Sequence, residues 1–279
     1  MKSIDLHTHS EYSDGSMSPS ELVAYAKEHF LSAIALCDHD CIGGVREAVS
    51  EGEKLGVEVV PAVEFAARGE TETHILGYYI DTDNKEINQS LNYICKVRAE
   101  RMSAICQSLQ NIGIDVTVDE VKKVSGNGIL CRAHIARLIV EKGYAPTVRE
   151  AFSRYLHLKN IAHSETQALT DREVIEIINN AGGQAFLAHP HLTKKPDDEL
   201  FEYLKLLKSY GLRGLEGYYT DYTPKMQEKY QAMAKKLNLE ISGGTDFHGS
   251  FKPDIEIGIG HGNMQIPYSV LQKIKDAHE

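Results

Sequence analysis

Short apolar runs alternate with amphipathic stretches along most of the chain. The apolar runs are typical of buried strands, and two of the amphipathic stretches open with helix-capping signals, at residues 18–21 and 170–173. Strands that alternate with helices predict a parallel sheet with crossover helices. We expect seven strands, near residues 4–6, 33–37, 57–63, 74–80, 185–188, 212–217 and 239–242.

One stretch, residues 96–165, departs from this alternation because its pattern is helical almost throughout. A long amphipathic run is followed by helical patterns at residues 118–125, 132–142 and 147–156. We interpret the stretch as a helical insertion after the fourth strand. The chain then divides into residues 1–95 and 166–279, which supply the α/β part, with the insertion 96–165 between them.

Histidine and carboxylate residues gather where the apolar runs end. His7 and His9 are two positions apart at the end of the first run, so their side chains point to one face of a strand and can bind one cation together. Ligands of this kind, without cysteine, suit Zn, Mn or Fe, and a carboxylate commonly bridges two such ions. Because β/α barrels keep their chemistry at the carboxyl ends of the strands, we expect all candidates there. The other candidates are Asp14, His39, Glu64, His74, His189, Asp246 and His248.

The order of these motifs resembles the PHP (polymerase and histidinol phosphatase) family, from Ile4 to about Gly260. The resemblance implies a metal-dependent phosphoesterase with an α/β fold, a distorted seven-stranded (β/α)7 barrel. It further implies divalent transition metals (Mn, Fe or Zn), two or three of them, in three ligand sets. The first set is His7, His9, Glu64 and Asp246, the second is Glu64, His74 and His189, and the third is Asp14, His39 and His248.

The inserted stretch carries a candidate substrate-binding motif, Arg132-Ala133-His134. In the branch of the family that the chain most resembles, an Arg-x-His motif in the inserted domain contacts a substrate phosphate, and Arg132 and His134 match it. A planar guanidinium suits this role because it can bind two phosphate oxygens at once. For His134, packing within a helix is the alternative interpretation.

Charge is distributed unevenly between the insertion and the rest of the chain. Residues 96–165 contain eleven Lys or Arg and seven Asp or Glu, a net charge of +4, so with −10 for the whole chain the other residues carry −14. A positive cap above a metal centre favours a phosphate-rich substrate, although scattered Lys and Arg are also usual on solvated helices. The net charge of −10 disfavours long nucleic acids as partners and still permits a small phosphorylated nucleotide or a short oligonucleotide.

The composition sets few further limits. A chain of 279 residues with 42% hydrophobic and 25% charged residues can form one α/β barrel or two domains. It contains no run of 18 apolar residues and no basic leader, so we expect a cytoplasmic protein with no membrane partner. Its five cysteines lack paired spacing, and we expect free thiols.

The resemblance implies hydrolysis of the 3′-phosphate of a nucleoside 3′,5′-bisphosphate, which leaves a nucleoside 5′-monophosphate. We expect a hydroxide that bridges two metals to attack phosphorus, with Glu64, Asp246 and His189 in the catalytic centre. The alternatives are a 5′-3′ exoribonuclease acting on short 5′-phosphorylated RNA, a histidinol-phosphate phosphatase, and a degenerate binding module. The sequence assigns no acid for the leaving group and leaves the metal identity and the oligomeric state open.

For three residues near the expected barrel mouth, the sequence leaves two possible roles open. Glu216, at the end of the sixth run, orients a metal ligand or faces solvent. The role of Tyr219 and Tyr222 is either to stack on a nucleotide base of the substrate or to anchor a loop. In this region, many members of the family that the chain resembles carry a histidine.

Overall fold

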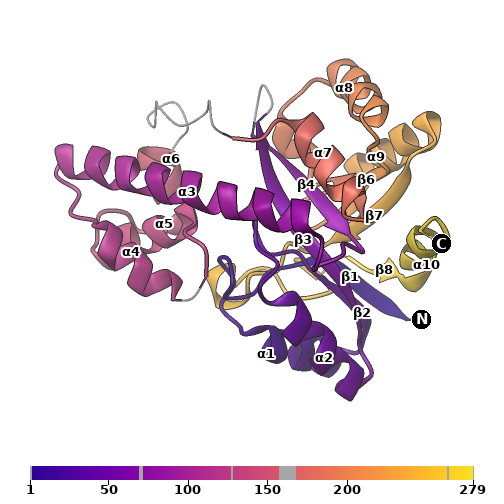
Figure 1. Cartoon of the computed structure of the whole chain (residues 1–279), viewed down its shortest axis with the longest axis horizontal. Helices are drawn as coiled ribbons and strands as arrows, with labels where there is room; N and C mark the ends of the chain where they lie inside the picture. Colours follow the sequence, from indigo (N-terminus) through magenta and orange to yellow (C-terminus); the bar gives the residue numbers. More distant parts are fainter. Residues whose placement is uncertain (1, 69–71, 127, 157–167, 263, 279) are drawn as a thin grey trace.

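A mixed sheet of eight strands runs through the described part of the molecule (Figure 1). The computed structural model describes residues 2–68, 72–126, 128–156, 168–262 and 264–278. The strands lie in the order β7-β6-β5-β4-β3-β2-β1-β8. Their bounds are β1 Ser3–Thr8, β2 Leu31–Leu36, β3 Glu58–Arg68, β4 Glu72–Tyr78, β5 Gln184–Leu187, β6 Gly214–Tyr219, β7 Glu240–Gly244 and β8 Ile266–Pro267.

The seven predicted runs fall on strands β1 to β7, but strand β4 runs antiparallel to both of its neighbours. Glu64 of β3 pairs with Leu76, and Ile75 pairs with Leu187 of β5. Only residues 69–71 separate β3 from β4, too few for the crossover helix that a parallel pair requires. The expectation of a parallel sheet is therefore wrong for β4. It is also wrong for β8, an eighth strand that pairs antiparallel with β1.

The sheet curls into a nearly closed barrel because the end of β1 meets the segment that follows β7. The backbone N–H of Asp246 donates to the carbonyl of His7 over 2.9 Å, and His9 N donates to the carbonyl of Phe247 over 2.9 Å. A Cβ at Gly244 would lie 2.3 Å from Cβ of His7, so only glycine allows this approach. The closure brings the beginning and the end of the sequence to one mouth.

Six helices pack around the sheet and bury one face each. Helices α1 and α7 begin with the capping boxes that the sequence predicts, at Ser18 and Thr170. Leu22 of α1 packs with Ile34 of β2, and α10 contributes Leu271 to the cluster that holds the residues of β1. The six helices are α1 Pro19–Glu28, α2 Val45–Leu55, α7 Asp171–Asn180, α8 Asp197–Ser209, α9 Pro224–Leu237 and α10 Tyr268–Asp276.

The remaining helices gather on one side of the sheet and share a hydrophobic core of their own (Figure 1). They are α3 Lys85–Asn111, α4 Val118–Ser125, α5 Arg132–Glu141 and α6 Val148–Tyr155. Met102 and Ile105 of α3 pack there with Ile135 and Ile139 of α5. The predicted boundary at residue 96 lies inside α3, and the predicted boundary at 165–166 lies outside the described residues.

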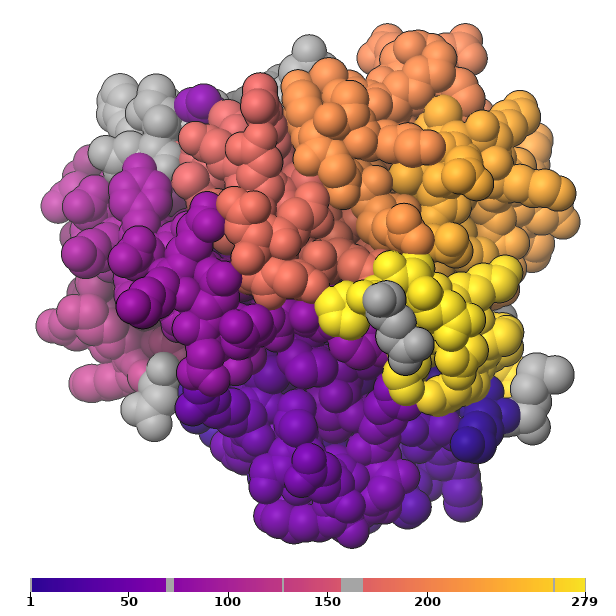
Figure 2. Space-filling view, turned by 45° about the vertical axis from the view of Figure 1, so that its right-hand side comes forward, coloured from indigo at the N-terminus to yellow at the C-terminus, as the bar shows by residue number. Residues whose placement is uncertain are grey.

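The two ends of the described chain lie side by side. Figure 2 shows α10 in yellow next to the indigo N-terminal residues, and Tyr268 N donates to the carbonyl of Lys2 over 3.1 Å. Within the described ranges, no helix is long and apolar enough to cross a membrane. The five cysteines are free thiols, as expected.

Candidate metal centre and cavity

Glu64 occupies the middle of the candidate site, and imidazoles surround both of its carboxylate oxygens. Its Oε2 lies 3.3 Å from Nε2 of His7, 3.4 Å from Nε2 of His9 and 2.9 Å from Nδ1 of His39. Its Oε1 lies 2.9 Å from Nδ1 of His74 and 3.0 Å from Nε2 of His189. A buried strand therefore carries a carboxylate that can bridge two cations.

His74 reaches this point from an unexpected end of its strand. It is the third residue of β4, which begins at Glu72 and runs antiparallel to β3. The expectation that every ligand follows the carboxyl end of its strand is therefore wrong for His74. It is also wrong for Glu64, which lies within β3, four residues before its end at Arg68.

In the described part of the chain, three sets of side chains have ligand atoms within 4.8 Å of one another. The set of His7, His9, Glu64 and Asp246 agrees with the first predicted set. The second set contains His39, Glu64 and His74. The predicted His189 is not in this set, but its Nε2 lies 3.0 Å from Oε1 of Glu64. The third set contains the predicted Asp14, His39 and His248 together with His9.

Five buried polar atoms in these sets have no hydrogen-bond partner among the described residues. They are Nε2 of His7, Nε2 of His9, Oδ1 of Asp14, Nδ1 of His39 and Oε2 of Glu64. An unsatisfied buried donor or acceptor costs about 1–3 kcal/mol, so five in one place would be a large penalty. Divalent transition metals bind this combination of imidazole nitrogen and carboxylate oxygen. The donor set therefore fits metal ions.

The pKa shifts keep the carboxylates in the form that binds metal. Burial alone raises the pKa of Glu64, but the imidazoles of His39, His7 and His74 together hold it well below its usual range. Burial likewise opposes ionisation of Asp14, and His39 and His248 lower its pKa well below normal. Burial and the neighbouring His248 lower the pKa of His9, which favours the neutral imidazole that metals require.

Glu216 supports two of the candidate ligands from behind. Its side chain is fully buried, Oε1 accepts a hydrogen bond from Nδ1 of His7 over 2.9 Å, and Oε2 accepts one from the backbone N–H of His189 over 2.6 Å. A carboxylate on one ring nitrogen directs the other nitrogen toward a metal. The structure therefore agrees with the first interpretation of Glu216, in which it orients ligands, and not with the second, in which it faces solvent.

Tyr219 and Tyr222 also act within the protein. The Tyr219 hydroxyl donates to Oδ2 of Asp246 over 2.9 Å, and the Tyr222 hydroxyl donates to the carbonyl of Glu216 over 3.3 Å. Both side chains are buried, and neither is among the cavity-lining residues. They therefore anchor the loop after β6 and are not placed to stack on a base.

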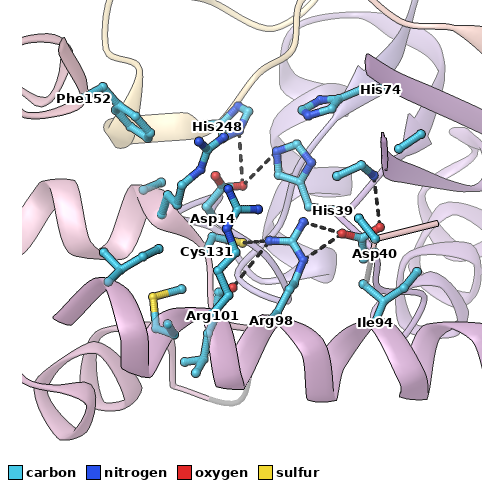
Figure 3. Close-up of a pocket in the computed structure, with 18 of the residues that line it drawn as sticks. Asp14, His39, Asp40, His74, Ile94, Arg98, Arg101, Cys131, Phe152 and His248 are labelled. Atoms are coloured by element: carbon cyan, nitrogen blue, oxygen red, sulfur yellow. Dashed lines mark hydrogen bonds and ion pairs between the residues drawn. The ribbon is translucent and has the colours of Figure 1, made fainter. Parts of the chain in front are cut away.

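A cavity of about 470 Å³ separates the candidate metal centre from helices α3, α5 and α6 (Figure 3). Asp14, His39, His74, His189, Asp246 and His248 form part of its wall. Apolar side chains such as Met102, Leu130 and Phe152 form another part. Six cationic residues also line it: Arg68, Arg98, Arg101, Arg132, Arg137 and Lys252. A concave site with cations beside carboxylates and imidazoles suits a phosphorylated small molecule.

The structure separates the two residues of the predicted phosphate-binding motif. Arg132 is the first residue of α5 and lines the cavity, with its guanidinium carbon 5.9 Å from the centre of the Phe152 ring. His134 is 2% exposed and is not among the lining residues. Its Nδ1 accepts a hydrogen bond from the backbone N–H of Cys131 over 3.1 Å, so it caps the start of α5. This geometry agrees with the packing interpretation of His134.

Arg98 is a residue of this site that the sequence analysis missed. It reaches from α3 to the buried carboxylate of Asp40, next to the candidate ligand His39 (Figure 3). Asp40 also accepts a hydrogen bond from Ala66 N over 3.1 Å. Arg98 therefore ties α3 to the loop after β2. A single arginine in a long amphipathic helix gives no sign of this role in the sequence.

A family profile and several known proteins match this chain over most of its length. The profile of the PHP domain matches residues 5–242. A 5′-3′ exoribonuclease of Haemophilus influenzae is 32% identical over 248 residues, which are 88% of this chain and 90% of that protein. A 3′,5′-nucleoside bisphosphate phosphatase of Chromobacterium violaceum is 28% identical over 260 residues, 92% and 91% of the two chains. A solved structure from Bifidobacterium adolescentis, described as a metal-dependent phosphoesterase, has a TM-score of 0.86 at 26% identity and covers 98% of this chain and 95% of that one.

Proposed function

Because this chain belongs to the PHP domain family and is a metal-dependent phosphoester hydrolase, we propose that it removes the 3′-phosphate from nucleoside 3′,5′-bisphosphates. The observation that carries the proposal is one cavity with the candidate metal ligands on one wall and Arg132 on another. A substrate with two phosphates can place one of them at the metals and the other at the arginine.

The rest of the cavity suits the sugar and base of a nucleotide. Phe152 and Leu130 offer apolar surface beside Arg132, and Arg101 adds a further cation from α3. A volume of about 470 Å³ lies within the range of sites for small organic ligands. We assign helices α3 to α6 the role of a cap that binds the part of the substrate away from the metals.

The candidate ligands and Glu216 take separate roles in the proposed reaction: some bind the metals and others position those ligands. The metals, when bound, supply a water of lowered pKa and neutralise charge on the phosphoryl oxygens. Glu64 joins two of the sets, and Glu216 fixes the ring of His7 and the backbone of His189. We assign metal binding, by two or three ions of Mn, Fe or Zn, to His7, His9, Asp14, His39, Glu64, His74, His189, Asp246 and His248.

A second candidate function is 5′-3′ exonuclease action on short RNA. The exoribonuclease of Haemophilus influenzae named above is the observation that favours it, because it is 32% identical to this chain. A 5′-phosphate of RNA could occupy the place at Arg132, with the following diester at the metals. Both candidates therefore use the same contacts and release a nucleoside 5′-monophosphate. They differ in the attacked phosphoryl group, which carries no further substituent in the bisphosphate and carries the rest of the chain in RNA.

A comparison of three substrates tests the proposal. With one metal at saturation, kcat/KM is measured for adenosine 3′,5′-bisphosphate, for a 5′-phosphorylated trinucleotide and for histidinol phosphate. We expect the bisphosphate to be the best substrate and Glu64→Gln to be inactive on all three. A preference for the trinucleotide that disappears without its 5′-phosphate would support the exonuclease instead. Preference for histidinol phosphate would contradict both nucleotide functions.

A further inference from the structure

The two carboxylate oxygens of Asp246 face different surroundings. Oδ1 lies 3.1 Å from Nε2 of His9 and 3.6 Å from Nε2 of His7, on the side of the candidate metals. Oδ2 accepts hydrogen bonds from the Tyr219 hydroxyl over 2.9 Å and from Nζ of Lys252 over 2.6 Å. Two donors therefore hold the oxygen that points away from His7 and His9.

A rigid turn places Lys252 at this point. Gly249 has a φ of +63°, and a Cβ there would lie 2.1 Å from Oγ of Ser16, so the turn requires glycine. Ser250 N donates to the same Oγ over 2.9 Å. On the other side of the turn, the guanidinium carbon of Arg137 lies 3.5 Å from the centre of the Phe251 ring. Contacts on both sides thus fix the segment that carries Lys252.

The ammonium group of Lys252 is accessible from the cavity, whereas the hydroxyl of Tyr219 is not. Lys252 lines the cavity and its side chain is 37% exposed, whereas Tyr219 is buried and not among the lining residues. An ammonium group carries three N–H bonds. Across the described ranges, Oδ2 of Asp246 is the one acceptor in hydrogen-bond contact with Nζ, which leaves N–H bonds for the cavity. Asp246 and Lys252 line the same cavity, and Nζ lies 2.6 Å from Oδ2 of this candidate ligand, so the cation stands beside the candidate metal centre.

We propose that Lys252 is a catalytic residue that donates a hydrogen bond to an oxygen of the attacked phosphoryl group, and that Tyr219 is a positioning residue that acts only through Asp246. The inference rests on the phosphoesterase function and uses the proposed bisphosphate as its first assay substrate. A fixed ammonium stabilises charge on the phosphoryl oxygens as the ester bond breaks. It does so without changing the ligand set of the metals.

The test compares Lys252→Met with Tyr219→Phe, because each variant removes one of the two hydrogen bonds to the same oxygen of Asp246. The loss of a group behind a metal ligand typically weakens metal binding about 10- to 100-fold, so both variants should need more metal. At saturating metal, confirmed by elemental analysis, we expect Tyr219→Phe to recover nearly the wild-type kcat/KM. Lys252→Met should remain roughly 10- to 150-fold below it, the effect of one charge-assisted hydrogen bond.

Binding of inorganic phosphate gives a second readout that does not depend on turnover. In calorimetry with the metal-loaded proteins, Lys252→Met should bind phosphate at least about tenfold more weakly than Tyr219→Phe. Lys252→Arg should recover part of the loss because it restores the charge. Lys252→Gln, which keeps a donor, replaces the methionine variant if that variant does not fold.

Two results would overturn the assignment. One is equal kcat/KM and equal phosphate affinity for the two variants at equal metal content. The other is a loss of metal in the Lys252 variants that excess metal does not reverse, which would assign the lysine to Asp246 alone. If the wild type hydrolyses a different phosphate ester, the proposed substrate fails, and the same comparison is made with that ester.

Discussion

At the scale of single residues, the candidate centre depends most on Glu64. Its side chain is fully buried and its carboxylate belongs to two of the three ligand sets, whereas Asp14 belongs to one. Residues that bind one metal together can be recognised from the sequence when they are close neighbours in it, as His7 and His9 are. The sequence did not reveal that His39 belongs to two of the three ligand sets, because the position of its ring depends on how the loop after β2 packs against β3.

The sharing of Glu64 leads to a prediction about metal content. Glu64→Gln should lose the ions of both sets that contain Glu64, whereas Asp14→Asn should lose only the ion of the set with His9, His39 and His248. The measurement is elemental analysis after reconstitution with Mn, Fe or Zn and removal of excess metal. Equal metal content in the two variants would contradict the sharing of Glu64.

Among the helices and strands, two features were not predicted from the sequence: the antiparallel direction of β4 and the buried ion pair made by helix α3. Strands β3 and β4 extend beyond the predicted apolar runs through charged residues, so the runs left residues 64–73 between the two strands where the structure leaves only residues 69–71. Helix α3 contains Arg98, whose side chain is 20% exposed and pairs with Asp40, which is 1% exposed. Whether an arginine in such a helix is solvated or buried depends on contacts distant in sequence. The capping boxes of α1 and α7 were predictable because they are local.

The burial of this ion pair leads to a prediction about stability. Arg98→Met should lower the free energy of unfolding by about 3–5 kcal/mol, because it leaves the buried carboxylate of Asp40 without its cation. Arg46→Met is the matched control: Arg46 pairs with Asp83, and their side chains are 69% and 78% exposed. It should change stability by less than about 1 kcal/mol. Urea denaturation of both variants measures the difference, and equal losses would show that burial of the pair does not matter.

At the scale of the whole molecule, the nearly closed barrel brings ligands from β1, β3, β4 and the segments after β2, β5 and β7 to one place. The sequence predicted the seven main strands and all nine residues that gather there, since each of the nine lies in a short local motif. It predicted a positive cap from residues 96–165 but singled out only Arg132 among the six cationic residues of the cavity wall. Arg68 of β3, Arg98 and Arg101 of α3, Arg137 of α5 and Lys252 after β7 are distant in sequence, and folding brings them together.

Metal ions should stabilise this whole arrangement. Their binding satisfies buried atoms of His7, His9, Asp14, His39 and Glu64 that otherwise lack hydrogen-bond partners among the described residues. Metal at about 100 times its dissociation constant should raise the unfolding temperature by roughly 5–10 °C relative to protein treated with a chelator. Differential scanning calorimetry measures this, with Glu64→Gln as the control that should respond much less. Identical unfolding temperatures with and without metal would contradict the metal centre.

The proposed function requires that one substrate spans the metals and Arg132. Its most direct test is the ratio of kcat/KM for adenosine 3′,5′-bisphosphate to that for adenosine 3′-monophosphate, measured with equal metal content in the wild type and in Arg132→Ala. We expect a large ratio in the wild type and a ratio near one in the variant, since losing a bidentate phosphate contact costs about 2–5 kcal/mol of transition-state binding. Arg132→Lys should fall between them. Arg154→Ala, which removes an exposed cation of α6 outside the cavity lining, should keep the wild-type ratio. A wild-type ratio near one, or the same large ratio in Arg132→Ala, would contradict the proposed function.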